Sequence, residues 1–306
     1  MKMSNVNAEP CGVLVIDKPS GMTSHDAVNK IRRLYNTKKV GHTGTLDPMA
    51  TGVLVILIGR AAKAAEYIVS DSKRYTAGLL LGITTDTLDT TGATLTTSKD
   101  IPDREKILEI LPEFTGAQKQ VPPMYSAIKK DGVKMVDLAR KGIEIELPAR
   151  DIEIYSLEGA ALSDTEYSLE VYCSKGTYIR SLCRDIGDKL GCGGVMSSLR
   201  RTASGAFDLS RSHTFDELEA MEYQERLGLL FDIESLFADC PKVVLPDFFA
   251  HLAHSGAHIY QKKIGASFED GRKIRLADKN GFFALGQVTR DSDGESVIKP
   301  IKQFVI

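Results

Sequence analysis

Hydrophobic residues fall in short runs separated by Gly, Pro and Asp, a pattern typical of a chain built from strands and short helices. The aliphatic run 53–58 (Val-Leu-Val-Ile-Leu-Ile) predicts a buried strand, because it is short and rich in β-branched residues. The similar run 12–18 is followed by Pro19 and Gly21, so it predicts a strand that ends in a turn. Five more segments are predicted to be strands: 74–82, 125–128, 149–157, 166–173 and 201–209.

Apolar residues at intervals of three and four predict helices between these strands. Ser24 is a suitable N-cap for a helix over 25–34, whose apolar stripe contains Ala27, Val28 and Ile31. Six more segments are predicted to be helices: 60–68, 103–111, 136–140, 177–190, 215–221 and 224–231. This mixture of elements predicts an α+β fold.

The pattern changes after Cys240 and Pro241, where short strands alternate with Gly and Asp turns. These strands are predicted at 243–245, 274–276, 282–288 and 297–301. We therefore expect two domains, a catalytic domain at 1–238 and a small β domain at 239–306.

Charge is balanced over the whole chain but not along it. The 306 residues include 39 Lys and Arg and 41 Asp and Glu, so the net charge does not indicate a nucleic-acid partner. Acidic residues gather at 216–234, whereas basic residues gather at 30–33, 38–39, 129–130, 140–141, 175–184 and 200–201. Any one of these clusters is explained equally well as a solvated surface.

Cysteine usage and hydropathy bear on the cellular compartment. The five cysteines are scattered and form no Cys-x-x-Cys pair, which disfavours a disulfide framework or a zinc site. The aliphatic run 53–58 is far shorter than the roughly 20 residues that cross a bilayer. Residues 1–9 contain no apolar segment of a signal peptide. We expect a cytoplasmic protein without membrane contact.

The segment 41–52 is the first candidate for chemistry. It combines glycines and threonines with one carboxylate, Asp47, placed before Pro48. It lacks the Gly-Lys-Ser/Thr ending of a P-loop and the spacing of a dinucleotide-binding turn, so nucleotide hydrolysis is not indicated. An Asp-Pro pair in a loop is commonly a simple turn. A chemical role for Asp47 requires a cation that keeps it ionised, and Arg180 is a candidate.

Two other groups contain residues of the types that bind metal ions. Asp86 and Asp89 lie in a Thr-rich loop without a third ligand nearby in sequence, and a solvated turn explains them as well. The histidines of the segment 251–258 are spaced for one side of a helix, but Gly256 interrupts that helix and no glutamate accompanies them. Neither group is expected to hold a metal ion.

Several motifs, taken together, resemble the bacterial tRNA pseudouridine synthases of the TruB type. The most specific is the segment 41–52, Gly-His-Thr-Gly-Thr-Leu-Asp-Pro-Met-Ala-Thr-Gly. The other motifs follow in family order at 18–24, 73–75, 85–89, 122–127, 176–180 and 199–202. The C-terminal part is similar, more loosely, to the PUA-type RNA-binding domain that closes many members.

The resemblance implies a pseudouridine synthase catalytic domain with a mixed, mainly antiparallel sheet, followed by a PUA-like domain. It implies isomerisation of uridine 55 in the T-arm loop of tRNA, a reaction that requires no cofactor and no metal. Asp47 is then the nucleophile, attacking C6 of the uracil or C1′ of the ribose. Arg180 pairs with this carboxylate, and its charge is expected to lower the pKa of Asp47. Tyr75, alternatively a simple core aromatic, stacks on the uracil.

The same resemblance assigns five further residues. His42 fills the gap left in the RNA when the base is flipped out. Tyr178 and Leu199 line the base pocket, and Asp89 borders it. Lys18 has a structural or RNA-contacting role. We expect a monomer that binds the T-arm stem-loop of tRNA without an obligatory protein partner.

Two other functions stay open at this point. A metal-dependent RNA hydrolase would use Asp47, Asp86 and Asp89, and EDTA would inactivate it. A non-catalytic RNA-binding or RNA-folding factor would keep its function when Asp47 is replaced.

Overall fold

The computed structural model describes residues 9–67, 72–126 and 147–304, together with 129–130, 133–135, 138, 143 and 145. Most of the helix predicted at 136–140 and the end of the strand predicted at 125–128 lie outside the described residues. The described start of that strand is a bend, so the prediction is wrong there.

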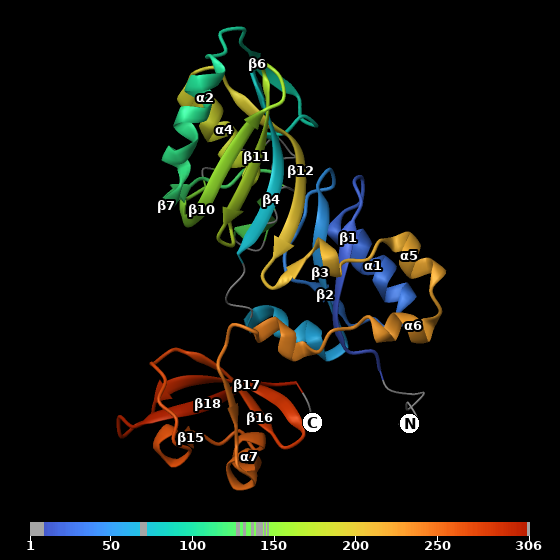
Figure 1. Ribbon diagram of the computed structural model, residues 1–306, viewed down its shortest axis with the longest axis vertical. Helices are drawn as coiled ribbons and strands as arrows, with labels where there is room; N and C mark the ends of the chain where they lie inside the picture. The colour runs from blue at the N-terminus through green and yellow to red at the C-terminus, as the bar shows by residue number, and fades with distance from the viewer. Residues whose placement is uncertain are drawn as a thin grey trace.

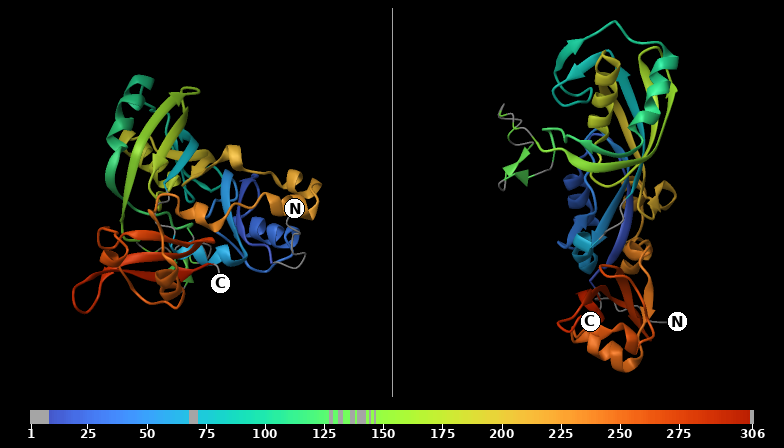
Figure 2. Two further views of the ribbon diagram at one scale, coloured as in Figure 1. Left: turned by 60° about the horizontal axis from the view of Figure 1, so that its bottom comes forward. Right: turned by 90° about the vertical axis from the view of Figure 1, so that its left-hand side faces the viewer.

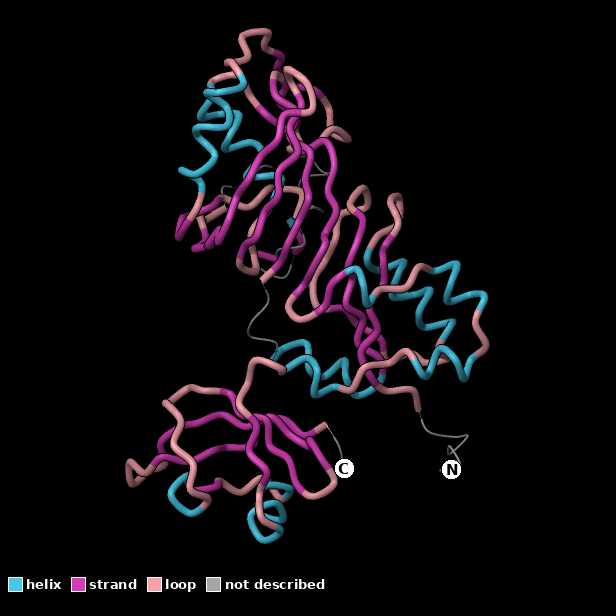
Figure 3. Tube along the Cα trace, viewed as in Figure 1, coloured by secondary structure: helices cyan, strands magenta, loops and turns pink. Residues whose placement is uncertain are grey.

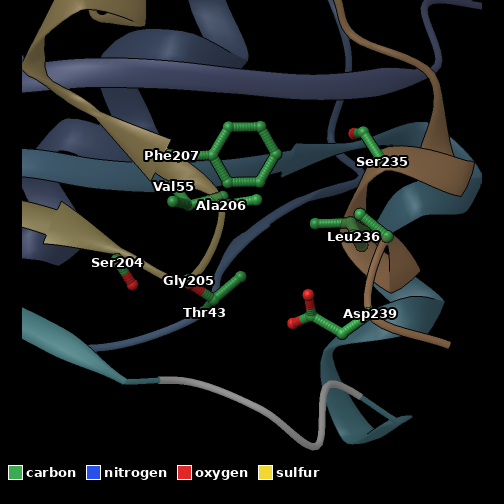
Figure 4. A pocket seen from close by; sticks show the side chains of 10 residues that line it. Thr43, Val55, Ser204, Gly205, Ala206, Phe207, Ser235, Leu236 and Asp239 are labelled. Atoms are coloured by element: carbon green, nitrogen blue, oxygen red, sulfur yellow. The ribbon is translucent and has the colours of Figure 1, made fainter.

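A twisted sheet forms the centre of the larger part of the molecule (Figure 1; Figure 3). Its strand order is β1-β3-β12-β4-β11-β10-β7, with β2 paired to β3 and β13 to β12. The strands are β1 (Gly12–Lys18), β2 (Val40–His42), β3 (Thr51–Ile58), β4 (Lys73–Leu81), β7 (Gly116–Gln120), β10 (Arg150–Ala161), β11 (Glu166–Cys173), β12 (Gly194–Ser204) and β13 (Phe207–Asp208). Among the described pairs of this sheet only β12 with β3 is parallel, which confirms the predicted mainly antiparallel α+β fold.

The continuous aliphatic run of β3 is explained by burial on both faces of the sheet. Leu54, Ile56 and Ile58 join the larger hydrophobic core, whereas Val53 and Val55 face a second core on the other side. Strand β1 divides its side chains between the same two cores. Successive side chains of a strand point to opposite faces, so only a strand covered on both sides loses its polar alternation.

Helices cover the sheet and complete the larger core. They are α1 (Ser24–Leu34), α2 (Arg104–Ile110), α4 (Ile179–Leu190), α5 (Phe215–Ala220) and α6 (Tyr223–Gly228). In Figure 1, α2 and α4 lie beside the half of the sheet that contains β10 and β11, and α1, α5 and α6 lie near β1. The N-cap of α1 is Thr23, not Ser24, because the Thr23 side chain accepts from the Asp26 amide in a capping box.

Short elements connect these parts. Two hairpins pair β5 (Ile83–Thr85) with β6 (Thr94–Thr97), and β8 (Lys129–Lys130) with β9 (Val133–Lys134). The 3-10 helices are η1 (Gly59–Tyr67), η2 (Leu111–Phe114), η3 (Leu209–Arg211), η4 (Ile233–Phe237) and η5 (Gln261–Lys263). The predicted helix at 60–68 is therefore a 3-10 helix, and the strand predicted at 201–209 begins earlier, at Gly194.

The C-terminal part forms a second sheet in the order β14-β16-β17-β18-β15. Its elements are β14 (Lys242–Val244), α7 (Asp247–His254), β15 (Ile259–Tyr260), β16 (Lys273–Asp278), β17 (Gly281–Arg290) and β18 (Ser296–Gln303). The four predicted strands are confirmed, while α7 and β15 were missed. Helix α7 ends at His254, so Gly256 lies beyond it rather than inside it.

Aromatic packing joins the second sheet to the larger part. The ring of Phe237 on η4 lies 5.6 Å from that of Phe304 and 6.1 Å from that of Phe282, measured between centroids. Figure 1 and the side view in Figure 2 place η1 and η4 between the two sheets. The predicted domain boundary between residues 238 and 239 therefore falls directly after η4, which packs against both the larger part of the molecule and the second sheet. This boundary stays a prediction. No helix among the described residues is long and apolar enough to cross a membrane.

Candidate active site

Hydrogen bonds anchor the loop that carries Asp47 at several backbone positions. The Thr43 amide donates to the Val55 carbonyl at 3.1 Å. Ser24 Oγ accepts from the Leu46 amide at 2.8 Å and donates to the Leu46 carbonyl at 3.0 Å. The Pro48 carbonyl accepts from the Gly21 amide at 2.8 Å. Because the residues on both sides are fixed, the backbone of Asp47 has little freedom.

Asp47 meets Arg180 in a two-point contact. Arg180 Nε lies 3.0 Å from Asp47 Oδ2, and Nη2 donates to Oδ1 at 3.2 Å. This fork fixes the direction of the carboxylate as well as its charge. The Asp47 side chain keeps 32% of its surface exposed, whereas Arg180 keeps only 6%. The Asp47 side chain is therefore partly accessible, whereas its arginine partner is enclosed by protein.

Arg180 lies in the first turn of α4 and is surrounded by acceptors. Nη1 donates to the Thr87 carbonyl at 3.0 Å, and Nη2 donates to the Tyr125 carbonyl at 2.8 Å. Asp89 Oδ2 lies 3.8 Å from Nη1. With its donors directed inward and its side chain buried, Arg180 is not placed to grip an RNA phosphate.

The ionisation of Asp47 reflects opposing effects. Burial raises the pKa of its carboxyl above the ordinary value, and the charges and hydrogen bonds of Arg180 work against that rise. Asp89 raises the pKa further and Lys18 lowers it. The net direction is upward, opposite to the one expected from the sequence, because burial outweighs the opposite charge.

Asp86 and Asp89 are occupied by hydrogen bonds of their own loop. Asp89 Oδ1 accepts from the Thr91 amide at 3.0 Å and from the Thr87 hydroxyl at 2.7 Å. Asp86 Oδ1 accepts from the Ala93 amide at 2.7 Å. The guanidinium of Arg180 lies between Asp47 and Asp89. Asp47 and Asp89 therefore lie on either side of one arginine. This arrangement does not support the alternative of a metal-dependent RNA hydrolase, in which the carboxylates would surround a metal ion.

Tyr75 and Leu199 share one face of the sheet beneath this loop. They lie on neighbouring strands, in the registers Tyr75↔Arg201 and Leu199↔Ala77. Opposite residues of an antiparallel pair point to the same face. Both side chains are nearly buried, at 6% and 9% exposure, and belong to the larger core. The fold thus presents an aromatic and an aliphatic side chain on a common face.

Tyr178, His42 and Lys18 complete the set expected from the sequence. Tyr178 is the N-cap residue of the helix that carries Arg180, and burial raises the pKa of its hydroxyl. His42 ends β2 and is partly buried, and burial, with Arg201 nearby, lowers the pKa of its imidazole. Lys18 is fully buried, and its ammonium donates to the carbonyls of Pro19, Met22 and Pro48 at 2.8, 2.7 and 3.3 Å. Burial lowers the pKa of Lys18 to about 8.

Of the two roles that the sequence left open for Lys18, these contacts favour the structural one. All three acceptors are backbone carbonyls of the turn after β1 and of the Asp47 loop. A fully buried ammonium group cannot reach an RNA molecule on the surface. Lys18 instead ties two sequence motifs together beside Asp47.

Two buried polar residues near the site were missed from the sequence. Gln120, at the end of β7, accepts from the Tyr178 amide at 2.8 Å and donates to the Tyr178 carbonyl at 3.1 Å. Arg201, 1% exposed, donates to three carbonyls of the loop and of β3. A sequence signal for the burial of Arg201 is its alternation with Leu199 and Ala203, which lie two residues away on the same face of a strand. The Arg200-Arg201 pair instead led to its assignment to a basic surface cluster.

The three histidines considered as metal ligands do not act together. His254 Nε2 lies 3.1 Å from Asp278 Oδ2, and its ring stacks on Phe283 at 4.0 Å between centroids. His251 lies one turn earlier on α7, and His258 lies beyond the end of the helix. Among the described residues, no group of three or more His, Cys, Asp or Glu side chains is arranged to hold a metal ion.

Comparison with known proteins identifies the family of the chain. Residues 32–179 match the model of the N-terminal domain of the TruB family pseudouridylate synthases, and residues 180–236 match that of the tRNA pseudouridylate synthase B C-terminal domain. A tRNA pseudouridine synthase B from Clostridium kluyveri is 45% identical over 295 residues, which cover 96% of this chain and 99% of the relative. The protein of the same name from Azoarcus sp. is 44% identical over 277 residues, 90% of each chain.

The fold has close counterparts among solved structures. A chain from the crystal structure of a Cbf5-Nop10-Gar1 complex superposes with a TM-score of 0.75 at 26% identity, covering 97% of this chain and 85% of that chain. The sheet, the Asp47 loop and its buried arginine thus belong to a pseudouridine synthase. The chain is a member of the TruB family of pseudouridylate synthases, as its sequence motifs indicated.

Proposed function

We propose that the chain is a tRNA pseudouridine synthase that isomerises uridine 55 in the T-arm loop, with Asp47 as the nucleophile. Its curated relatives carry the name tRNA pseudouridine synthase B. The observation that carries the role of Asp47 is its carboxylate, which two nitrogens of Arg180 orient while the Asp47 side chain keeps 32% of its surface exposed.

The reaction rearranges one nucleotide without an external reactant. The bond from N1 of uracil to C1′ of ribose breaks, and a bond from C5 to C1′ forms. C5 loses a proton and N1 gains one, so the composition of the RNA is unchanged. A carboxylate nucleophile splits this exchange into two easier steps through a covalent intermediate. Attack at C6 and attack at C1′ both agree with the position of Asp47.

The other site residues have roles that suit a flipped base. A base inside a folded loop must leave its stack before it can react, at a cost of a few kcal/mol. We assign Tyr75 and Leu199 to the flat and apolar surfaces against the uracil, and Tyr178 and Asp89 to the border of the same site. His42, on the partly buried end of β2, is the residue that we assign to the space left by the base.

Conversion of a T-arm stem-loop RNA by the purified chain tests this function. We expect pseudouridine at position 55 only, with the same yield in EDTA, and no product from an RNA that has cytidine there. Asp47→Asn should reduce the single-turnover rate more than about 100-fold and leave binding nearly unchanged, because the amide keeps the shape but not the nucleophile. Asp86→Asn is the matched control and should retain the rate. RNA cleavage, or residual turnover of Asp47→Asn above about a hundredth of the wild-type rate, contradicts the proposal.

A further inference from the structure

Arg201 lies at the junction of three strands under the Asp47 loop. Its backbone pairs with Gly52 of β3 in parallel and with Tyr75 of β4 in antiparallel register. The approach to β3 is very close: a Cβ atom on Gly52, whose φ is +99°, would lie 2.2 Å from the Arg201 carbonyl oxygen. The site therefore requires glycine at position 52, and it places the Arg201 side chain directly beneath the loop.

The side chain of Arg201 binds the loop and the strand that follows it. Nε donates to the Val53 carbonyl at 2.7 Å, Nη2 donates to the Gly44 carbonyl at 3.1 Å, and Nη1 donates to the Thr45 carbonyl at 3.4 Å. Ser24 and Lys18 bond other residues of this region, so the three carbonyls that Arg201 binds are not bonded by either of them. The guanidinium thus fixes the part of the loop between His42 and Asp47.

The stability of the core alone does not explain why an arginine is buried at position 201. Arg201 is 1% exposed, and within the described part of the chain no carboxylate forms an ion pair with it. A buried charge without a counter-ion is costly, and well-packed apolar residues commonly replace buried charges without loss of stability. Its neighbour Arg200 has the ordinary arrangement, an ion pair with Asp17 at 2.7 Å in which the Arg200 side chain is 42% exposed.

We infer that Arg201 is a positioning residue for the reaction: it fixes the 43–46 loop so that Asp47 meets both Arg180 and the substrate in the productive direction. This inference rests on the proposed function of Asp47 as the nucleophile. Its physical basis is that a displacement of about 1 Å at a reacting group costs about 100-fold in rate, even when the altered residue does not touch the substrate.

The charge of Arg201 also acts on two other residues of the proposed site. It lowers the pKa of the His42 imidazole, after the larger effect of burial, and it lowers the pKa of Lys18 in the same way. Loss of this charge should therefore raise the pKa of His42, which NMR of the free enzyme can follow with His42→Gln for assignment.

Three variants of the full chain separate positioning from RNA binding. Arg201→Met removes all three hydrogen bonds, Arg201→Lys keeps the charge without the fork, and Arg200→Met is the control on the same strand. We expect the saturated single-turnover rate on the T-arm stem-loop to fall about 100-fold for Arg201→Met and about tenfold for Arg201→Lys. The Kd should change less than threefold in all variants, and Arg200→Met should keep its rate. Amide hydrogen exchange of residues 43–46 should accelerate in the Arg201 variants, with β4 unchanged.

The outcomes distinguish this inference from the proposed function. A normal rate in Arg201→Met, with Asp47→Asn inactive, overturns the positioning role and leaves the nucleophile in place. A weaker Kd with a normal saturated rate makes Arg201 an RNA-binding residue and also overturns it. If both Arg201 variants lose the folded state, Arg201 supports the whole fold, and the inference of a specific action on the loop fails. If Asp47→Asn keeps its turnover, the proposed function itself fails.

Discussion

Arg180 and Asp47 are 133 residues apart in the sequence, and their side chains meet through two contacts of 3.0 and 3.2 Å. One partner is supplied by a loop between β2 and β3, and the other by the first turn of α4. The arginine is buried and the carboxylate is partly exposed. This asymmetry is what a nucleophile requires, since its orienting partner stays fixed while its reactive side stays open.

Replacement of Arg180 by lysine should separate orientation from charge. Lysine keeps the positive charge but cannot contact both carboxylate oxygens through two nitrogens of one rigid group. We expect the single-turnover rate at saturating RNA to fall about 100-fold, which corresponds to about 2.7 kcal/mol of barrier. The affinity for RNA should change little. A normal saturated rate with weaker binding and a shallower salt dependence would instead make Arg180 a phosphate contact.

The raised pKa of Asp47 should set the acid limit of activity. In the proposed mechanism the ionised form is the nucleophile, so the rate should fall as the pH drops through a pKa above the ordinary value of 3.8. Arg180 lowers this pKa, so Arg180→Gln should raise it further and move the limit to higher pH. Carbon-13 NMR of labelled aspartate in the free protein measures both values, with Asp47→Asn for assignment. Asp208, whose pKa is held low by Ser210, is the internal control and should not move. An unchanged Asp47 pKa in Arg180→Gln would show that the two groups are not coupled.

Gln120 should affect the reaction through the helix that carries Arg180. Gln120→Met removes both hydrogen bonds to the Tyr178 backbone and frees the start of α4. We expect about a tenfold loss in single-turnover rate with little change in RNA affinity, because the altered group is the support of Arg180. Gln118→Met is the matched control on β7, since Gln118 bonds to the Phe114 carbonyl instead. Equal single-turnover rates for Gln120→Met and Gln118→Met would show that Gln120 has no specific role in the reaction.

Removal of the second sheet should weaken tRNA binding more than it slows the chemical step. A chain that ends at Asp239 keeps every residue of the proposed site but exposes Phe237, which packs on Phe282 and Phe304. We therefore expect a lower melting temperature, a weaker Kd and a saturated single-turnover rate within about threefold of the full chain. Circular dichroism is the control that tests whether the shortened chain is folded. A folded chain whose saturated rate collapses would place the second sheet in the active site and contradict the division at 238/239.

The Asp47 loop was identified from the sequence because its glycines, its Asp-Pro pair and the aliphatic run after it are local signals. The same holds for α4, whose apolar residues follow the helical period, and for β1 and β3, whose continuous aliphatic runs are typical of strands buried on both faces. The cap of α1 was placed one residue late, because Thr23 and Ser24 are both good caps and only the bond from the Asp26 amide distinguishes them. The short helix α7 was missed because Gly256 was expected to interrupt a helix in this segment, whereas the helix ends before it, at His254.

The tertiary structure alone decided what the polar residues of those motifs do. Arg200 and Arg201 are neighbours of the same type, yet one forms a surface ion pair and the other is buried under the Asp47 loop. Lys18 was open to an RNA-contacting role until its burial and three carbonyl acceptors placed it inside the protein. The direction of the Asp47 pKa was likewise set by burial rather than by its charged partner. Residue type and local pattern specify the chemistry that is available, but charge–charge distance and desolvation depend on segments far apart in the chain, which only folding brings together.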